Sequence, residues 1–246
     1  MILQTKGLTK SFGGVFAIDQ VDFDLEPGII QALIGPNGAG KTTLFNVITG
    51  LFKADDGMVL FDGLDITGWE PYQICHKGLS RTFQIINIFP GLSVFENIQM
   101  AVVSHKRETK NLFARKEKMF REEVFQLLEI IGLSDKVDSI GGNMSLGEKK
   151  RLEMAIALAN EPKLLLLDEP TSGMGPEETA EIMDLVKKLR DELKITICFV
   201  EHDMNAVFQW AERITVLHQG KIIASGSPLD IKNNQQVQRV YLGGEI

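Results

Sequence analysis

Residues 35–43 decide the fold of this chain, and they are Gly35-Pro36-Asn37-Gly38-Ala39-Gly40-Lys41-Thr42-Thr43. This stretch fits the phosphate-loop pattern G-x-x-x-x-G-K-[ST]. The apolar run at residues 29–34 precedes it and predicts a buried strand, and residues 42–49 follow it and predict the first turns of a helix. A strand, a glycine loop and a helix in this order are typical of a phosphate-binding loop.

The chemistry of such a loop comes from its backbone and two side chains. Glycines at positions 35, 38 and 40 allow a tight turn without Cβ clashes, so that consecutive N–H groups point into one concavity. The N-terminus of the following helix adds a positive partial charge. Lys41 is placed to reach the β- and γ-phosphates, and the Thr42 hydroxyl to bind Mg²⁺. The alternative, a glycine-rich turn with an incidental lysine, does not account for both flanks.

The composition limits the possible partners and locations. The chain has 246 residues, enough for one large domain or two lobes with a sizeable core, and its net charge of −7 argues against nucleic-acid binding. No apolar run approaches the roughly 18 residues that span a bilayer, and no signal peptide is evident. Cys75 and Cys198 are too isolated to predict a disulfide framework or a metal site. We therefore expect a cytoplasmic protein with at most a peripheral membrane role.

The pattern along the chain changes from β to helical and then to α/β. Residues 1–28 alternate apolar and polar positions between glycine breaks and predict antiparallel strands. Most segments from residue 71 to residue 160 have helical spacing. From residue 163 onward, continuous apolar runs alternate with helical patterns, which predicts a parallel sheet covered on both faces. We therefore expect a parallel α/β core interrupted by a helical insertion.

One long amphipathic helix is predicted over residues 106–131 of the insertion. Its apolar positions include Phe120, Val124, Leu128 and Ile131, and its other positions carry charges of both signs. A solvated helix face is the favoured interpretation of these charges. A surface that meets a membrane or a partner protein is the alternative.

Ligands of parallel sheets bind beyond the carboxyl ends of the strands, and chemically reactive residues follow predicted strands at several places. Asp168 and Glu169 end the leucine run at residues 164–167, where Asp168 is a candidate Mg²⁺ anchor and Glu169 a candidate general base. His202 follows the next strand and is a candidate to hold a γ-phosphate and orient water. A helix or turn cap is the alternative for the two carboxylates, and a structural role is the alternative for His202.

Weaker signals come from single residues. Gln84 follows a short extended segment, although a loop glutamine alone indicates little. Phe12 is either an exposed ring that stacks on a base or a core residue, and the pattern leaves both open. Ser145 and Glu148 fit a capping box, which predicts a helix from Ser145 to Ala159.

Together these residues resemble the motifs of the ATP-binding cassette (ABC) family, in the family's order and over essentially the whole chain. Residues 35–43 are similar to Walker A, and residues 164–169 are similar to Walker B with the catalytic carboxylate. Gln84 matches the Q-loop residue, residues 144–148 match the signature segment, and residues 170–175 match the D-loop. His202 matches the switch histidine, and Phe12 falls where the family's adenine-stacking aromatic lies. Leu146 departs by replacing a signature glycine, so its side chain must point away from the phosphate. Gly175 departs by replacing the D-loop aspartate, which affects the expected polar contact between two ATP sites.

The resemblance implies an α/β fold with a P-loop NTPase (RecA-like) core and parallel sheet, an N-terminal antiparallel β subdomain and an inserted α-helical subdomain. The whole chain, 1–246, would be a single nucleotide-binding domain. Residues 1–72 and 160–226 would form the core with the β subdomain, 73–159 the helical subdomain with the signature segment, and 227–246 a C-terminal helical tail.

The resemblance also implies ATP and Mg²⁺ as cofactors. Glu169, His202 and Lys41 would be catalytic, and Thr42, Gln84 and Asp168 would hold Mg²⁺. The nucleotide would contact Phe12, Gly35, Pro36, Asn37, Gly38, Ala39, Gly40, Lys41, Thr42, Thr43 and Gln84. Two ATPase subunits, identical or related, would bind head to tail around two ATP molecules. Ser145, Leu146, Gly147 and Glu148 of one subunit would then complete the ATP site of the other.

Finer similarities indicate an importer. Residues 78–84, 89–97, 201–204 and 240–243 resemble the ATPase subunits of branched-chain amino-acid importers, although urea, amide and lipopolysaccharide transport ATPases share parts of these segments. The expected partners are membrane permeases, with a short helix entering a groove near residues 84–98, and indirectly a solute-binding protein. The expected location is cytoplasmic and peripheral on the inner face of the cell membrane. A soluble cassette protein without a transport role is the alternative.

Overall fold

The structure is a computed structural model that describes residues 1–106 and 120–242. Its N-terminal part forms an antiparallel sheet with the strand order β2-β1-β5-β6, and β3 pairs with β1 on a side branch. The strands are β1 (Leu3–Phe12), β2 (Val15–Val21), β3 (Asp24–Leu25), β5 (Asp56–Phe61) and β6 (Leu64–Asp65). The predicted antiparallel β region at the N-terminus is confirmed, and residues 56–65 extend it.

A second sheet has the strand order β11-β10-β4-β9-β8-β7, and its pairs are parallel except for β10 with β11. Its strands are β4 (Ile30–Ile34), β7 (Leu79–Arg81), β8 (Leu164–Asp168), β9 (Thr196–Val200), β10 (Arg213–His218) and β11 (Lys221–Gly226). Because β4, β9 and β8 are parallel neighbours, the loops that follow them leave the sheet at the same edge. The predicted parallel α/β core is confirmed.

Successive residues of the central strands face two different apolar clusters. Leu164 and Leu166 of β8 belong to the cluster that contains α1 (Lys41–Ile48) and the antiparallel sheet. Leu165 and Leu167 belong to the cluster that contains α5 (Leu146–Leu158) and α6 (Pro176–Leu193). Both faces of the strand are therefore buried, which explains why its sequence is a continuous leucine run.

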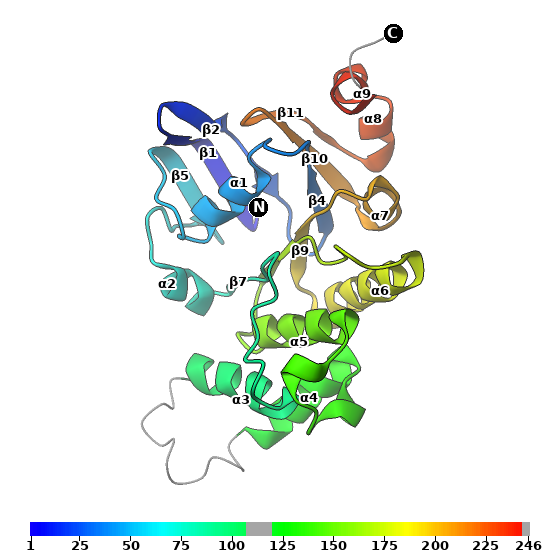
Figure 1. Cartoon of the computed structure of the whole chain (residues 1–246). Coiled ribbons are helices and arrows are strands. Elements are labelled where there is room, and N and C mark those ends of the chain that lie inside the picture. The colour runs from blue at the N-terminus through cyan, green and yellow to red at the C-terminus, as the bar shows by residue number, and fades with distance from the viewer. Residues whose placement is uncertain (107–119, 243–246) are drawn as a thin grey trace.

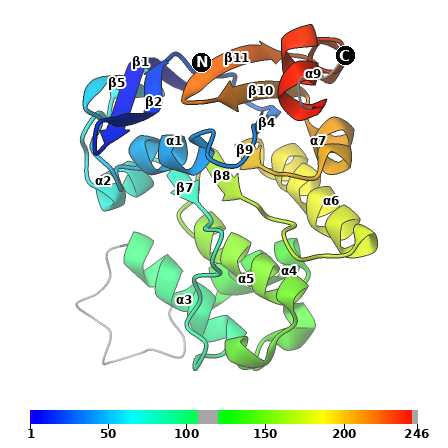
Figure 2. The ribbon, with the colours of Figure 1, turned by 45° about the horizontal axis from the view of Figure 1, so that its top comes forward.

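The helical insertion packs onto the second of these clusters. Figure 1 and Figure 2 show α3 (Val94–His105), α4 (Arg121–Ile131) and α5 together at one end of the molecule, away from the antiparallel sheet. Val124, Leu128 and Ile131 point from α4 into the shared core. The remaining helices are α2 (Pro71–His76), α7 (Met204–Trp210), α8 (Pro228–Lys232) and α9 (Gln235–Leu242), with short 3₁₀ turns at Ser134–Lys136 and Gly141–Asn143.

The prediction of one continuous helix over residues 106–131 is wrong at Lys106 and at Phe120, while the predicted helix end at Ile131 is confirmed. Lys106 is the C-cap residue of α3, so the first residue of the predicted helix ends another one. Phe120 has a φ of 55° immediately before α4, and this left-handed backbone interrupts a right-handed helix. Residues 107–119 lie outside the described residues. Apolar spacing continues across such a break because Phe120 still packs against the core.

Candidate functional site

The loop between β4 and α1 is shaped by glycines that no other residue can replace. A Cβ on Gly35 would lie 2.1 Å from the carbonyl oxygen of Leu217. A Cβ on Gly40 would lie 2.2 Å from the carbonyl oxygen of Ala17, and Gly40 also has a φ of 107°. The loop therefore fits tightly under two neighbouring segments while its outer surface stays free.

Lys41 begins α1 and turns back over this loop. Its Nζ donates to the carbonyl oxygens of Gly35 at 2.6 Å and Pro36 at 3.1 Å, and the residue is only 6% exposed. Burial lowers the pKa of Lys41, and the charges of Glu169 and Asp168 act in the opposite direction. The ammonium is thus held beside the loop, with two acidic side chains close enough to affect its charge.

A cavity of about 310 Å³ opens above the loop and gathers most of the predicted site residues. Its lining consists of Ala17, Asn37, Gly38, Ala39, Gly40, Lys41, Thr42, Thr43, Gln84, Glu169 and His202. Gly40 caps α1 without a side-chain hydrogen bond, so backbone N–H groups of the first turn are available to an anion. Gly35 and Pro36 lie behind the lining, where they hold Lys41.

Glu169 is the centre of a small polar network in this cavity. Its Oε2 accepts a hydrogen bond from Nε2 of Gln84 at 3.1 Å, and its Oε1 lies 3.0 Å from Nε2 of His202. Glu169 also has a φ of 51°, which is an unusual backbone conformation for a glutamate and is common at functional sites. Residues from the loops after β7, β8 and β9 thus meet at one carboxylate.

Asp168 has one satisfied and one free carboxylate oxygen. Its Oδ2 lies 2.6 Å from Nη2 of Arg81, in an ion pair whose side chains are only 4% (Arg81) and 2% (Asp168) exposed. Its Oδ1 is buried and has no hydrogen-bond partner among the described residues. A buried carboxylate oxygen without a partner fits a nearby cation, and Thr42 and Gln84 add the oxygen donors that Mg²⁺ prefers. The residues present therefore fit a bound Mg²⁺.

The signature segment forms the N-terminus of α5. Ser145 accepts a hydrogen bond from the Glu148 backbone N–H at 3.3 Å, and Glu148 accepts one from the Ser145 N–H at 2.9 Å, which confirms the predicted capping box. These bonds, with that from Lys136, lower the pKa of Glu148. None of the residues 145–148 lines the cavity at the phosphate loop in this single chain. Leu146 instead points toward the loop after β8, where a Cβ on Gly173 would lie 3.3 Å from its Cδ2.

Phe12 lies on the surface of the antiparallel sheet and is not a core residue. It is 47% exposed and meets Phe52 edge to face, with ring centroids 5.4 Å apart. It does not line the cavity at the phosphate loop. Of the two interpretations that the sequence left open, the structure excludes the buried one.

Several buried charged residues around the site were missed by sequence reasoning. Arg81 holds Asp168, and Glu201 accepts hydrogen bonds from the backbone N–H of Thr171 at 2.8 Å and of His202 at 3.1 Å. Glu153 accepts from backbone N–H groups on both sides of Gln84. The available signal was a charge inside an apolar run, as at Glu153 between Leu152 and Met154.

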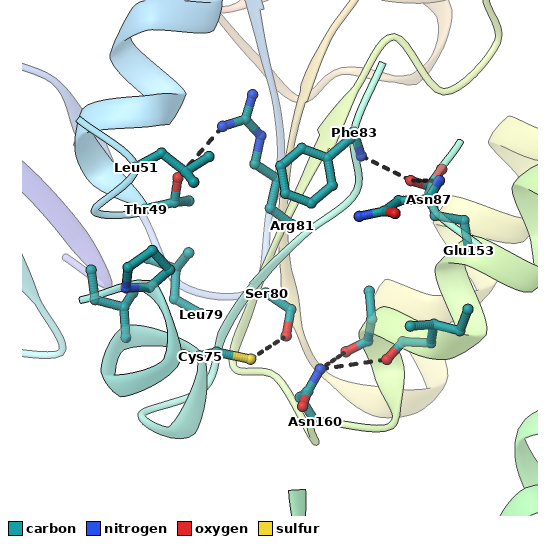
Figure 3. Close-up of a pocket in the computed structure, with 14 residues that line it drawn as sticks. Thr49, Leu51, Cys75, Leu79, Ser80, Arg81, Phe83, Asn87, Glu153 and Asn160 are labelled. Atoms are coloured by element: carbon teal, nitrogen blue, oxygen red, sulfur yellow. Dashed lines mark hydrogen bonds between the residues drawn. The ribbon is translucent and has the colours of Figure 1, made fainter. Parts of the chain in front are cut away.

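A second cavity, of about 210 Å³, lies between the core and the helical insertion (Figure 3). Residues of α2, β7 and the segment after β7 form one wall, and residues of α5 form the other. The full lining is Thr49, Leu51, Pro71, Ile74, Cys75, Leu79, Ser80, Arg81, Phe83, Asn87, Glu153, Ile156, Ala157 and Asn160. From the range 84–98, where a groove was expected, Asn87 contributes to it. Three residues of the same range, Ser93, Phe95 and Glu96, line a further cavity of about 550 Å³ together with Gln99, Arg121, Val137 and Asp138. That a groove at this range receives a partner helix stays a prediction.

The described geometry defines a class of protein. A glycine loop leading into a helix, a buried lysine, and a glutamate held by glutamine and histidine surround one cavity. An aspartate with a free oxygen precedes this glutamate at the end of its strand and does not itself line the cavity. This arrangement is that of a phosphate-loop nucleotide hydrolase.

Comparisons with known proteins give the family. Residues 18–172 match the family described as ABC transporter, and residues 221–246 match the family described as branched-chain amino acid ATP-binding cassette transporter. The chain is 36% identical over 251 residues to the "High-affinity branched-chain amino acid transport ATP-binding protein BraF" of Pseudomonas aeruginosa, covering 98% of each protein. The chain therefore belongs to the ABC transporter family, as one of its ATP-hydrolysing cassettes.

Solved structures agree with this assignment. The ADP conformation of an ATP-binding cassette of an ABC transporter superposes with a TM-score of 0.86 at 33% identity, covering 98% of both chains. A dimeric post-hydrolysis state of another ATP-binding cassette, bound to ADP and Pi, superposes with a TM-score of 0.78 at 26% identity, covering 92% of this chain and 98% of that one. The expected fold class is thereby confirmed. No helix in the described part of the chain is long and apolar enough to cross a membrane.

Proposed function

We propose that this chain is the ATPase subunit of an importer for branched-chain amino acids. The observation that carries the ATPase chemistry is the cavity in which Glu169, bonded to Gln84 and facing His202, lies beside the phosphate loop. The solute class is supported by the similarity to BraF, which is named as a branched-chain amino acid transport ATP-binding protein, and by the family match at residues 221–246.

Each site residue has a role that follows from its position. Loop N–H groups and Lys41 bind the phosphates, for which Lys41 exchanges its bonds to Gly35 and Pro36 for phosphate oxygens. Glu169 takes a proton from the attacking water, and His202 orients this water and the γ-phosphate. Phe12 stacks on the adenine. Thr42, Gln84 and Asp168 would hold Mg²⁺, which supplies positive charge to the phosphates.

The active unit is a head-to-tail pair of subunits. The cavity of one chain lacks residues 145–148, whose serine hydroxyl and N-terminal helix dipole would bind the γ-phosphate from a partner subunit. The dimeric ADP-bound and Pi-bound relative supports such a pair. Two ATP molecules would hold the subunits together, and ATP hydrolysis would let the subunits separate.

We also propose that a membrane permease docks at the second cavity. The cavity lies between α5 of the helical insertion and the core strand β7 with the segment that follows it, so an inserted helix would contact both the insertion and the loop that carries Gln84. Leu51, which lines this cavity, is 47% exposed, and Tyr72, next to the lining residue Pro71, is 64% exposed. Docking would place the chain on the inner face of the cell membrane, with a solute-binding protein acting on the other side.

The variant Glu169→Gln tests the ATPase mechanism. We expect turnover to fall by at least about 100-fold because the general base is lost, while ATP-bound dimers accumulate. Phosphate release and size-exclusion chromatography with ATP measure the two effects. Normal turnover by this variant would remove Glu169 from its role.

The solute and the partners need a separate experiment. The tagged chain is purified from gently solubilised membranes of its native cell, and the proteins that accompany it are identified. Recovery of two permeases and a second cassette subunit, with leucine uptake that depends on this chain, is the expected result. Recovery without any membrane subunit would overturn the transport assignment and leave the ATPase chemistry in place.

A further inference from the structure

The loop that carries Gln84 is tied to the helix that begins after Ser145. Glu153 of α5 accepts, at a single oxygen, hydrogen bonds from the backbone N–H groups of Phe83 at 3.0 Å and Asn87 at 3.3 Å. These two residues lie on either side of Gln84 in the sequence. Figure 3 shows the carboxylate of Glu153 facing both of them from α5. One carboxylate oxygen therefore closes the loop around Gln84.

This carboxylate is held in an unfavourable environment. Glu153 is 3% exposed, and its second oxygen, Oε2, has no hydrogen-bond partner in the described part of the chain. Burial raises the pKa of Glu153. A buried and half-satisfied carboxylate costs more free energy than a neutral amide, which would keep an acceptor oxygen for the same two N–H groups. Stability alone does not explain why a glutamate stands here.

The helix α5 also touches the reacting end of the site. Lys150, one turn before Glu153, is buried and donates from Nζ to the backbone carbonyl of Glu169 at 3.3 Å. Gln84, inside the loop that Glu153 holds, donates to the side chain of Glu169 at 3.1 Å. The helix α5 is therefore hydrogen-bonded both to the backbone of Glu169 at the end of β8 and to the loop that carries Gln84.

We propose that Glu153 is a positioning residue that couples the Gln84 loop to α5, so that displacement of Gln84 by bound nucleotide moves Ser145–Glu148 toward the partner's ATP. The inference rests on the proposed function, since it assumes that residues 145–148 act in a dimer. Two hydrogen bonds to backbone groups on either side of Gln84 transmit a displacement that a single flexible side-chain contact would absorb. The link also borders the second cavity, so an occupant there would act on the same loop.

Glu153→Ala and Glu153→Gln separate coupling from folding. Both are made in the Glu169→Gln background, where ATP is not consumed. In Glu153→Ala we expect amide hydrogen exchange at Phe83 and Asn87 to accelerate by about tenfold or more, because the acceptor is gone. Protection of residues 145–148 on ATP addition and ATP-dependent dimerisation are lost, while ATP affinity of the monomer is retained. Glu153→Gln keeps a carbonyl acceptor and restores these properties.

Glu129→Ala is the matched control, because it removes an exposed glutamate from α4 of the same insertion and should change none of these readouts. ATP-induced protection at 145–148 that persists in Glu153→Ala would overturn the inference, even if the amides at 83 and 87 exchange faster. Dimers that form normally in that variant would do the same. If Glu169→Gln with the native Glu153 never dimerises with ATP, the proposed function itself fails.

Discussion

Asp168, the proposed Mg²⁺ anchor, is held in place by a single buried arginine. Arg81 binds Oδ2 of Asp168 through Nη2 and the side chain of Asn46 through Nη1 at 2.7 Å, and its guanidinium lies over the rings of Phe45 and Phe83. The arginine is therefore fixed on several sides, and it fixes the carboxylate in turn. The free Oδ1 keeps one orientation, which is what a metal ligand or a water that serves the metal requires.

Arg81→Met is therefore expected to destabilise the fold by about 3–5 kcal/mol, because it leaves the buried charge of Asp168 without a partner. Urea unfolding measures this loss. The control is Lys163→Met, which removes an ion pair with Asp62 in which both side chains are more than half exposed. The control should cost less than about 1 kcal/mol. Equal effects of the two changes would contradict the special role of the buried pair.

The raised pKa of Glu153 makes stability depend on pH. Burial favours the protonated form, so the folded state binds this proton more tightly than the unfolded chain. The resulting stability is present below the unfolded pKa and is lost as pH rises through the raised folded pKa. Glu153→Gln cannot titrate. We expect it to gain stability over the native chain when urea unfolding is compared between about pH 4 and about pH 8. A constant difference over this range would contradict the assignment.

At the scale of secondary-structure elements, α3 and α5 both begin with a capping box, but they lie in different places in the fold. Ser93 and Ser145 each accept from the backbone N–H three residues on, and Glu96 and Glu148 bond back to the serine N–H. Either cap stabilises its own helix by satisfying free N–H groups. Only the cap of α5 falls in the segment proposed to contact ATP on a partner subunit.

Ser93→Ala and Ser145→Ala form a matched pair for this reason. Each should lower stability by about 1 kcal/mol through the lost cap, as thermal or urea unfolding would show. ATP-dependent dimerisation of the Glu169→Gln chain should survive Ser93→Ala and weaken in Ser145→Ala. Dimers that are equally weakened by both changes would point to general instability rather than to a contact with ATP.

Elements with short-range signals were predictable from the sequence. Burial on both faces requires a continuous apolar run, which predicted the strand at residues 30–34 and β8. A serine and a glutamate three residues apart predicted the capping box at Ser145. The break in the helix at Phe120 has no signal in the sequence, because the Phe120 ring continues the apolar spacing while its backbone does not continue the helix. Helical periodicity reports which side chains are buried, and not whether the helix is continuous.

The same distinction holds for the site. Residues 35–43, Glu169 and His202 were predictable because their chemistry is encoded at strand ends. Arg81 and Glu153 were not assigned roles, because each acts on a group that is distant in the sequence and adjacent only in the fold. The left-handed backbone of Glu169 was also not predictable, since nothing in the residue type favours it.

At the scale of the whole molecule, the proposed function divides each ATP site into two parts, the half-sites, that lie apart in one chain. The phosphate loop and Glu169 line one cavity, while residues 145–148 lie at the start of α5 and do not line it. A pair related by two-fold symmetry would bring each half-site against the complementary half-site of its partner, twice. Each complete ATP site of the dimer would then be a composite site, built from the phosphate loop of one chain and residues 145–148 of the other. In a mixed dimer of one native and one variant chain, a defect in either part would therefore disable only one of the two composite sites.

Two inactive variants should therefore restore activity to each other. Lys41→Ala disables the phosphate loop, and Ser145→Arg disables the segment offered to the partner, so each variant alone has no intact composite site. A mixed dimer combines the loop of the Ser145→Arg chain with the Ser145 segment of the Lys41→Ala chain in one intact site. An equal mixture should recover about a quarter of native turnover, since half the dimers are mixed and each has one intact site. Phosphate release from the mixture, compared with each folded variant alone, measures this. A mixture as inactive as its components would mean that the ATP site is not shared between two copies of this chain.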